Sequence, residues 1–288
     1  MNTAIYQPAS DLHPAPYTSR YVAAGGLQLH YLDYGTAGKP VILCIHGGAA
    51  HAHWFDFFAR SVIADHHVLA LNLRGHGDSE WMRPPAYTYE LYVSDMAEVI
   101  ERLGLQDFVL VGHSMGGLVS LLYQATHQGR ARGLIVVDSN MRMSDTRAGV
   151  LRDIGARHGT RYATHEEFVR NFRLRPAGTT AAPEIVRHLA THSGRQLQDG
   201  SWVHKFDRHT YAQRNGLDGL PFWSRITVPA LLVKSDRSGR LGPDLVADVG
   251  RLCPQVECVE VPNSDHHVFL DNPTGFAHVV KDFLNRTT

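Results

Sequence analysis

The chain has 288 residues, of which 43% are hydrophobic and 19% are charged, as expected for a globular domain with an ordinary core. Its 28 Lys and Arg residues balance 28 Asp and Glu residues, so no global charge attracts nucleic acid or an anionic membrane. No run approaches the roughly 18 apolar residues of a membrane span, and the start lacks the segments of a secretory signal. We therefore expect a cytoplasmic protein without a nucleic-acid or membrane partner, and the sequence leaves a homodimer open.

The three cysteines, Cys44, Cys253 and Cys258, are too few for a disulfide framework and lack metal-type spacing. The 19 histidines form close groupings only at positions 51 and 53, 66 and 67, and 266 and 267. None of these has the HExxH spacing that places two ligands on one helix face. The sequence therefore predicts reduced thiols, no metal and no cofactor.

In chain order, apolar runs alternate with amphipathic stretches, which is typical of a sheet with helices packed on its faces. Residues 27–34 alternate with period two and predict an antiparallel strand near an edge. Continuous apolar strands are predicted at 41–45, 68–71, 108–111, 134–137 and 230–233, and a last strand at 256–260. Helical spacing is found at 54–63, 89–103, 118–127 and 273–284. This order predicts a mainly parallel, right-handed wound sheet.

The regularity breaks at residues 139–225, where interrupted helical patterns cover 166–172, 184–190 and 211–217. We predict a helical cap at 139–225, a core at 20–138 and 226–288, and an extended N-terminal arm at 1–19. The cap holds thirteen Arg and one Lys against eight acidic residues, which gives it a charge of about +6. A solvated helical surface explains this charge, and attraction of an anionic substrate is the alternative.

The strongest chemical signal is Gly112-His113-Ser114-Met115-Gly116, which directly follows the strand 108–111 and precedes a helix. A sharp strand-to-helix turn lifts the serine hydroxyl above the sheet edge, and only glycine at both flanking positions leaves room for it. The following helix directs free N–H groups at the reacting oxygen. The pattern predicts that Ser114 is a nucleophile, and the alternative is a tight glycine turn with an incidental serine.

From residue 22 to residue 284, apart from the cap, the sequence resembles the α/β-hydrolase family. That resemblance implies an α/β fold with a mainly parallel eight-stranded sheet, helices on both faces and a cap inserted after the sixth strand. His46-Gly47-Gly48 follows the strand 41–45, as the oxyanion loop of the family does. The resemblance implies that the backbone N–H groups of Gly48 and Met115 bind the oxyanion.

The general base is expected late in the chain. Residues 261–273 resemble the "PxAGHxxxxExP" segment of the family, and this register makes His266 the catalytic imidazole, with Asp265 replacing the usual glycine. A neutral imidazole near pH 7 is suited to take the serine proton and return it to the leaving group. His267 is the neighbouring alternative.

Two residues compete for the role of the triad acid. Most family members carry it after the penultimate strand, where Ser238 or Gly239 stands here and Asp236 lies early. Asp138 ends the strand 134–137, one strand beyond the nucleophile, and some family branches carry the acid there. Both residues preserve the chain order nucleophile, acid, base. We prefer Asp138, because the strand that follows the helix after Ser114 returns to the same sheet edge, and we keep Asp236 as the alternative acid.

These residues predict a serine hydrolase that cleaves a small to medium-sized carboxylic ester or lactone through an acyl-enzyme on Ser114. Two alternatives remain: a carbon–carbon bond hydrolase acting on a ring-cleavage diketone, and a receptor-like protein that binds a ligand without turnover. Predicted pocket residues come from the loops around the triad and from the cap. They are His46, Gly47, Trp54, His113, Met141, Trp202, Trp223 and His267.

Overall fold

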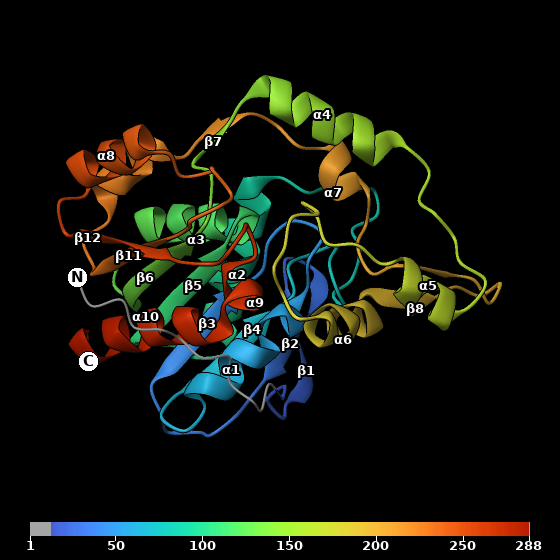
Figure 1. Ribbon diagram of the computed structural model, residues 1–288, viewed down its shortest axis with the longest axis horizontal. Coiled ribbons are helices and arrows are strands. Elements are labelled where there is room, and N and C mark those ends of the chain that lie inside the picture. The colour runs from blue at the N-terminus through green and yellow to red at the C-terminus, as the bar shows by residue number, and fades with distance from the viewer. Residues whose placement is uncertain (1–12, 288) are drawn as a thin grey trace.

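The computed structural model describes residues 13–287, so most of the predicted N-terminal arm lies outside the described residues. Its centre is an eight-stranded sheet of order β1-β2-β4-β3-β5-β6-β11-β12 (Figure 1). The strands are β1(Thr18–Ala24), β2(Leu27–Asp33), β3(Val41–Ile45), β4(His67–Leu71), β5(Phe108–His113), β6(Ala131–Val137), β11(Ala230–Ser235) and β12(Val256–Val261).

The strands from β4 to β12 in this order run parallel to one another, whereas β1 and β2 are antiparallel at one edge. Every residue of β5 is buried, because helices cover this central strand on both faces. At the other edge, most of β12 is exposed or half-buried. The predicted mainly parallel sheet and its two edges are therefore confirmed.

Helices cover both faces of the sheet. Alternating strand residues divide the core into two clusters: Leu43 and Leu110 face one, and Ile42 and Val109 face the other. The first cluster contains residues of α2(Tyr89–Arg102), α3(Met115–Thr126) and α8(Pro243–Leu252), and the second contains residues of η1(Ala52–Phe55), α1(Asp56–Val62), α9(Val268–Asp271) and α10(Pro273–Arg286). Figure 1 shows α3 and α8 on the opposite side of the sheet from α1 and α10.

Residues 139–225, which we call the cap, leave the sheet after β6, the sixth strand along the chain, and return at β11. The cap helices are α4(Asp145–Ala156), α5(His165–Asn171), α6(Pro183–Ser193), α7(His209–Ala212) and η2(Leu220–Arg225). Its short strands form two separate two-stranded sheets, β7(Arg142–Met143) with β10(Leu217–Asp218), and β8(Gly194–Gln196) with β9(Trp202–His204). In Figure 1, α4 to α7 arch over the carboxyl ends of the central strands.

Among the longer elements, local sequence signals missed β1, α4 and α8. β1 begins at Thr18, inside the predicted arm, and buries only Val22 and Ala24, too few residues to show an alternating pattern. Helix α4 buries only Ala148 and Gly155, so it has no apolar stripe. None of the helices in residues 13–287 has the length and apolar character to cross a membrane.

Candidate active site

The turn between β5 and α3 holds Ser114 in a strained conformation, with φ of +53° and ψ of −118°. The neighbouring backbone leaves no room for side chains at the flanking glycines. A Cβ at Gly112 would overlap the Gly116 carbonyl and the Ser120 hydroxyl, and a Cβ at Gly116 would overlap the carbonyls of the β3 end. The glycine spacing is therefore a requirement of this turn, which raises the serine to the sheet edge.

His266 lies in the loop between β12 and α9, directly beside the serine. Its Nε2 is 3.0 Å from the Ser114 Oγ. The His113 Nε2 donates a hydrogen bond of 2.9 Å to the His266 backbone carbonyl, so the residue before the nucleophile supports the loop that carries the imidazole. Two contacts therefore connect the end of β5 and the turn that follows it to the loop that carries His266.

Asp138 follows the end of β6 and completes the chain of contacts. Its Oδ2 is 2.8 Å from the His266 Nδ1, and its side chain is fully buried. The Ser238 hydroxyl donates a hydrogen bond of 2.9 Å to the other carboxylate oxygen. Asp138 has a φ of +40°, a left-handed backbone that side chains rarely adopt.

Asp236, the alternative acid, has a different place. Its carboxylate accepts the backbone N–H groups of Asn263 at 2.9 Å and Ser264 at 2.8 Å. These bonds hold the start of the loop that carries His266, and the imidazole itself contacts Asp138 instead. Asp236 is therefore a candidate positioning residue, and the structure brings Asp138 to the acid position.

The electrostatic surroundings favour the neutral imidazole. Burial, followed by the positive charge of Arg240, lowers the pKa of His266 well below its usual range. Burial also raises the pKa of Asp138, and the hydrogen bond from Ser238 opposes that rise. A neutral His266 has a free electron pair at Nε2, which is the state that accepts a proton from serine.

Two backbone donors line the same space. The N–H of Met115 begins α3 and has no partner inside the helix, and the described hydrogen bonds give the Gly48 N–H no acceptor. Ala49 has a φ of +57°, which sharpens the turn after β3. Both Gly48 and Met115 line the cavity above Ser114, where free donors can face a developing negative charge.

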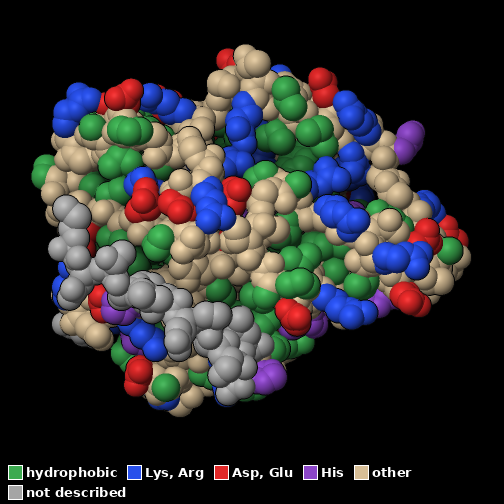
Figure 2. All heavy atoms as spheres, viewed as in Figure 1, with side chains coloured by type: hydrophobic (Ala, Val, Ile, Leu, Met, Phe, Trp, Pro, Cys, Tyr) green, Lys and Arg blue, Asp and Glu red, His purple; other side chains and the backbone are tan. Residues whose placement is uncertain are grey.

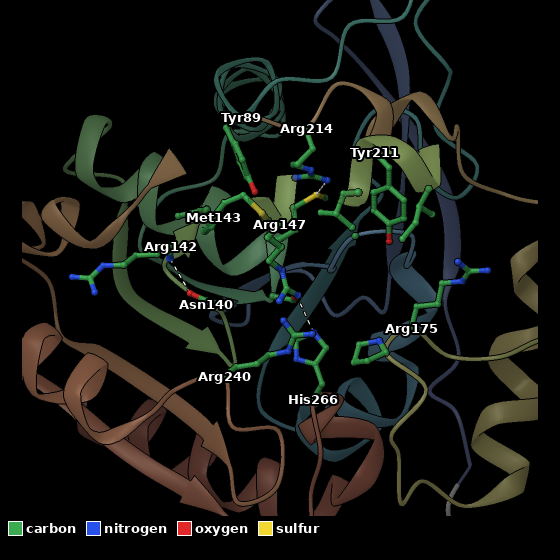
Figure 3. Close-up of a pocket in the computed structure, with 17 residues that line it drawn as sticks. Tyr89, Asn140, Arg142, Met143, Arg147, Arg175, Tyr211, Arg214, Arg240 and His266 are labelled. Carbon is green, nitrogen blue, oxygen red and sulfur yellow. Dashed lines mark hydrogen bonds between the residues drawn. The ribbon is translucent and has the colours of Figure 1, made fainter. Parts of the chain in front are cut away.

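A cavity of about 260 Å³ opens above the triad, between the core and the cap (Figure 3). Besides Ser114 and His266, its walls combine apolar side chains of α3, α4 and β7 with tyrosines and arginines from both regions. The lining residues are Gly48, Tyr89, Met115, Leu118, Asn140, Arg142, Met143, Arg147, Leu151, Ile154, Arg175, Pro176, Tyr211, Arg214 and Arg240.

Arg214 is the most unusual of these residues, because it is only 3% exposed and has no carboxylate partner within residues 13–287. Its guanidinium contacts the Met115 sulfur and lies over the Tyr89 ring, and its Nε has no hydrogen-bond partner. Burying an unpaired cation is costly unless an anion joins it. Arg214 therefore contributes a positive charge to the cavity wall that no carboxylate of residues 13–287 neutralises.

Three further arginines, Arg147, Arg175 and Arg240, line the cavity and form no ion pair with any described residue. Burial and the positive charge of Arg147 lower the pKa of Arg240, which indicates crowding of like charges. On the face shown in Figure 2, Lys and Arg side chains gather below α4. None of the described residues that line the cavity is acidic, so its electrostatics favour an anionic ligand.

The eight residues predicted for the pocket do not line this cavity, and four of them are buried around the triad loops. His46 accepts the Leu73 N–H at 3.1 Å, and Gly47 packs its backbone against His113. His267 contacts the Pro176 carbonyl at 3.1 Å, beneath the cap. These residues are neighbours of the triad and oxyanion residues in the sequence, but the backbone directs their side chains beneath the active site and away from the cavity.

The other four predicted pocket residues belong to packing clusters. Trp54 is buried beside the His267 ring and reaches only a small space next to Gly48. Met141 and Trp223 are fully buried in the core cluster, and Trp202 packs on His165 in the cap. These four large apolar side chains therefore contribute to packing within the cap and the core, whereas arginines are among the residues that line the cavity.

Sequence reasoning did not select any of the cavity arginines. The only signal was the charge of about +6 over residues 139–225, which does not tell which arginines turn inward. Among the described residues, two groups have the spacing of metal ligands: His113, His266 and His267 at the triad, and a cluster away from the cavity. The first group is already occupied by the hydrogen bonds described above.

Comparison with known proteins places this geometry in a family. Residues 40–273 match the family model described as alpha/beta hydrolase fold. An esterase of Mycobacterium tuberculosis is 27% identical over 94% of this chain and 90% of its own length. The 2-(acetamidomethylene)succinate hydrolase of Mesorhizobium japonicum is 26% identical over 96% of this chain and 99% of its own length.

The fold is also similar to a solved structure. The crystal structure of E-2-(acetamidomethylene)succinate hydrolase superposes with a TM-score of 0.81, at 23% identity, over 94% of this chain and all of that chain. The family model covers most of the chain, and the eight-stranded, mostly parallel sheet agrees with the fold that it describes. The protein belongs to the α/β-hydrolase fold family and is a hydrolase of that superfamily.

Proposed function

We propose that the protein is a serine hydrolase that cleaves a carboxylic ester or lactone in a small substrate bearing a carboxylate. The observation that carries this proposal is the hydrogen-bonded chain Ser114–His266–Asp138, which ends in a cavity with an unpaired buried cation, Arg214. The triad supplies the chemistry, and the arginines select the charge of the substrate.

In the proposed mechanism, the Ser114 Oγ attacks the carbonyl carbon while its proton moves to the His266 Nε2. The carbonyl oxygen becomes an oxyanion that accepts hydrogen bonds from the Gly48 and Met115 N–H groups. As the tetrahedral intermediate collapses, the carbon–oxygen bond of the leaving group breaks, and the imidazolium gives its proton to that oxygen. Water then attacks the acyl-enzyme with the same proton transfers and releases the acid and Ser114.

Asp138 stabilises the imidazolium that forms in each step. Its buried carboxylate lies 2.8 Å from the His266 Nδ1, so the imidazolium forms next to a negative charge that is already in place. Ser238 fixes the second carboxylate oxygen, which keeps the acid oriented toward the imidazole. Arg214 and the arginines nearer the cavity opening would pair with the substrate carboxylate, because no carboxylate within residues 13–287 does so.

A second candidate reaction, cleavage of an amide bond in a dicarboxylate, draws support from one relative. The hydrolase named for 2-(acetamidomethylene)succinate spans nearly the full length of both chains, and a succinate carries two carboxylates. The same attack and oxyanion stabilisation apply, with nitrogen as the leaving atom that His266 protonates. A cavity rich in arginine suits either substrate.

The test uses pairs of matched substrates with the purified protein. One pair consists of two esters and the other of two amides. Within each pair, the acyl group of one compound ends in a methyl group and that of the other ends in a carboxylate. We expect Ser114-dependent hydrolysis with a clear preference for the carboxylate member of the ester pair. Hydrolysis of only the amide pair would select the second candidate. Binding of the carboxylate compounds without turnover would favour a ligand-binding role and overturn the proposal.

A further inference from the structure

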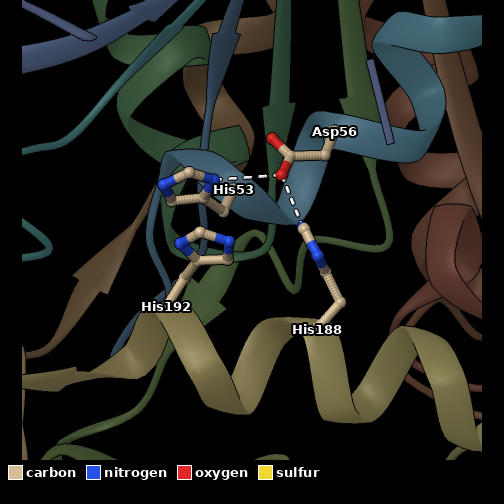
Figure 4. Close-up of side chains that lie close together, drawn as sticks. All are labelled: His53, Asp56, His188 and His192. Atoms are coloured by element: carbon tan, nitrogen blue, oxygen red, sulfur yellow. Dashed lines mark hydrogen bonds and ion pairs between the residues drawn. The ribbon is translucent and has the colours of Figure 1, made fainter. Parts of the chain in front are cut away.

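Charged and titratable side chains gather at two places where the cap meets the core. At the first, Asp56 accepts hydrogen bonds from His53 at 3.0 Å and His188 at 2.6 Å (Figure 4). The His192 ring stacks on the His53 ring, with 3.7 Å between centroids. These contacts account for the first group without a ligand. The second group surrounds a pocket beside the catalytic cavity, and two of its arginines have no anionic partner within residues 13–287.

This pocket, which we call the side pocket, has a volume of about 470 Å³. Its walls come from α4, from cap residues 176 and 178, from the loop at residues 237–240 after β11, and from Asp265. Several of its lining residues are exposed, so the side pocket opens to solvent. Four residues line both this pocket and the catalytic cavity, and the two spaces therefore adjoin; they are Asn140, Arg147, Pro176 and Arg240.

The side pocket lies on the side of the triad from which a leaving group departs. Asp265, in its wall, directly precedes His266. Ser238, also in its wall, donates its hydrogen bond to Asp138, the partner of that imidazole. In the proposed mechanism, His266 gives its proton to the leaving oxygen, so this oxygen must lie next to the imidazole when the bond breaks. The remainder of the leaving group then extends past His266 toward the side pocket.

Arg147 and Arg240 bring positive charge to this side of the triad. Figure 3 shows both side chains beside His266, whereas Arg214 lies at the other end of the cavity near Tyr89. Burial, then the charge of Arg240 and to a lesser degree that of Arg147, lowers the pKa of His266, which agrees with this closeness. Neither guanidinium forms an ion pair with a described residue. A single substrate carboxylate paired with Arg214 therefore leaves both charges unmatched.

The lining of the side pocket carries an excess of positive charge. Besides Arg147 and Arg240 it contains Arg237, whose Nε is 3.9 Å from the neighbouring Asp236. The only acidic residue among its described lining residues is Asp265, whose Oδ1 accepts the next backbone N–H at 2.7 Å. An anion would balance this excess, and guanidinium groups bind carboxylates through paired, charge-assisted hydrogen bonds.

We propose that the side pocket binds a carboxylate on the leaving part of the substrate. This inference rests on the proposed function, in which Arg214 pairs with a carboxylate on the acyl part. It places a second negative charge on the other side of the scissile bond. The substrate class is then an ester whose acid part and alcohol part each carry a carboxylate.

The division of the substrate between two spaces also gives the first product a way out. When the carbon–oxygen bond breaks, the leaving oxygen takes its proton from His266, and the acyl group stays on Ser114. The released hydroxy acid departs through the side pocket, because its carboxylate is already held there by Arg147 and Arg240. Water then reaches the acyl-enzyme through the space that this product has vacated.

The experiment compares two half-esters of adipic acid, so that both substrates have the same acyl part with its carboxylate. The leaving group of one is p-nitrophenol, and that of the other is p-nitrophenol with a carboxylate beside the nitro group. Each kcat/KM is divided by the rate constant for hydroxide-catalysed hydrolysis of the same ester, which removes the difference in chemical reactivity. We expect the intact chain to prefer the second ester by about 10-fold in this normalised ratio.

Variants test the charges of the wall through the same ratio. R237Q, which alters the side pocket alone, should lower the preference by about 3-fold, and R240Q should abolish most of it, because Arg240 is half-buried. D265N should raise the preference by about 3-fold, because it removes a negative charge and keeps an oxygen for the backbone N–H. R170Q, which removes an exposed cap arginine outside both spaces, is the matched control for net charge. R214Q should slow both esters equally and leave the ratio unchanged.

The results separate this inference from the proposed function. Equal normalised kcat/KM for the two esters in the intact chain would overturn the inference alone, and so would a ratio that R237Q and R240Q both leave unchanged. A ratio that falls in D265N would contradict attraction by positive charge as the cause of the preference. Hydrolysis of neither ester would overturn the proposed function and the inference together.

Discussion

The core and the cap of this protein differ in what fixes their functional side chains. In the core, Ser114 and Asp138 follow the ends of neighbouring parallel strands, so the sheet itself sets their separation. In the cap, Arg147, Arg175 and Arg214 come from helices and connections that form only short strands of their own. The comparison teaches that the sheet holds the candidate chemistry, whereas the irregular cap carries the charges for which we propose a role in recognition.

The largest expected effect falls on the core. S114A should lower kcat for any cleaved substrate by about 10⁴-fold or more, because it removes the attacking oxygen. Binding of a carboxylate ligand should persist in this variant, since the cavity arginines are unchanged. Steady-state kinetics and calorimetric titration measure the two effects, and equal loss of both would contradict the division of roles between core and cap.

The second prediction compares two aspartates of the core. D138N should lower kcat by about 10⁴-fold, because an amide facing Nδ1 neither stabilises the imidazolium nor fixes its tautomer. D236N should lower kcat by less than about 10-fold and mainly reduce Tm, because it weakens two bonds to the loop after β12. If D236N is the more damaging in kcat, the proposed acid is wrong.

The third prediction concerns the cap alone. R214Q should lower kcat/KM for a carboxylate-bearing ester by about 100-fold, chiefly through KM, because the buried counter-charge for the substrate is lost. The matched neutral ester should change by less than about 3-fold. R170Q, which removes an exposed cap arginine outside the cavity, is the control for net charge. Equal losses for both esters would assign Arg214 to folding.

The fourth prediction tests a positive charge of the core that lies close to the triad. Burial and the charge of Arg240 lower the pKa of His266, so kcat/KM should decline only when the pH falls well below 6.5. R240Q removes one repelling charge, and therefore raises the pKa of His266 and moves the acid limb to higher pH. A pH profile with a neutral ester measures the shift, and an unmoved acid limb would contradict it.

The smallest expected effect is that of salt. The arginines near the cavity opening attract an anionic substrate through partly exposed charges, which ions screen. Raising the ionic strength from about 0.01 M to about 0.15 M should lower kcat/KM several-fold for the carboxylate ester and leave the neutral ester unchanged. A common response of both esters would point to a general effect on the protein instead of on recognition.

The sequence alone determined much of the core, because its signals are local. Continuous apolar runs predicted the central strands, and the Gly-x-Ser-x-Gly spacing predicted the turn that the crowding at Gly112 and Gly116 now explains. The resemblance of residues 261–273 to a segment of the family selected His266 over His267, and His266 lies beside Ser114 in the structure. The family resemblance added the strand count, which local patterns did not contain, because β1 buries only two residues.

Only the tertiary structure decided which residues meet. Asp138 and Asp236 are equivalent in chain order, and the parallel pairing of β6 with β5 and β11 brings the first to the imidazole. The inward turn of Arg214, the burial of Trp223 and the meeting of His53 with His188 depend on how the cap folds back over the core. Such contacts join residues far apart in the chain, and no local periodicity encodes them.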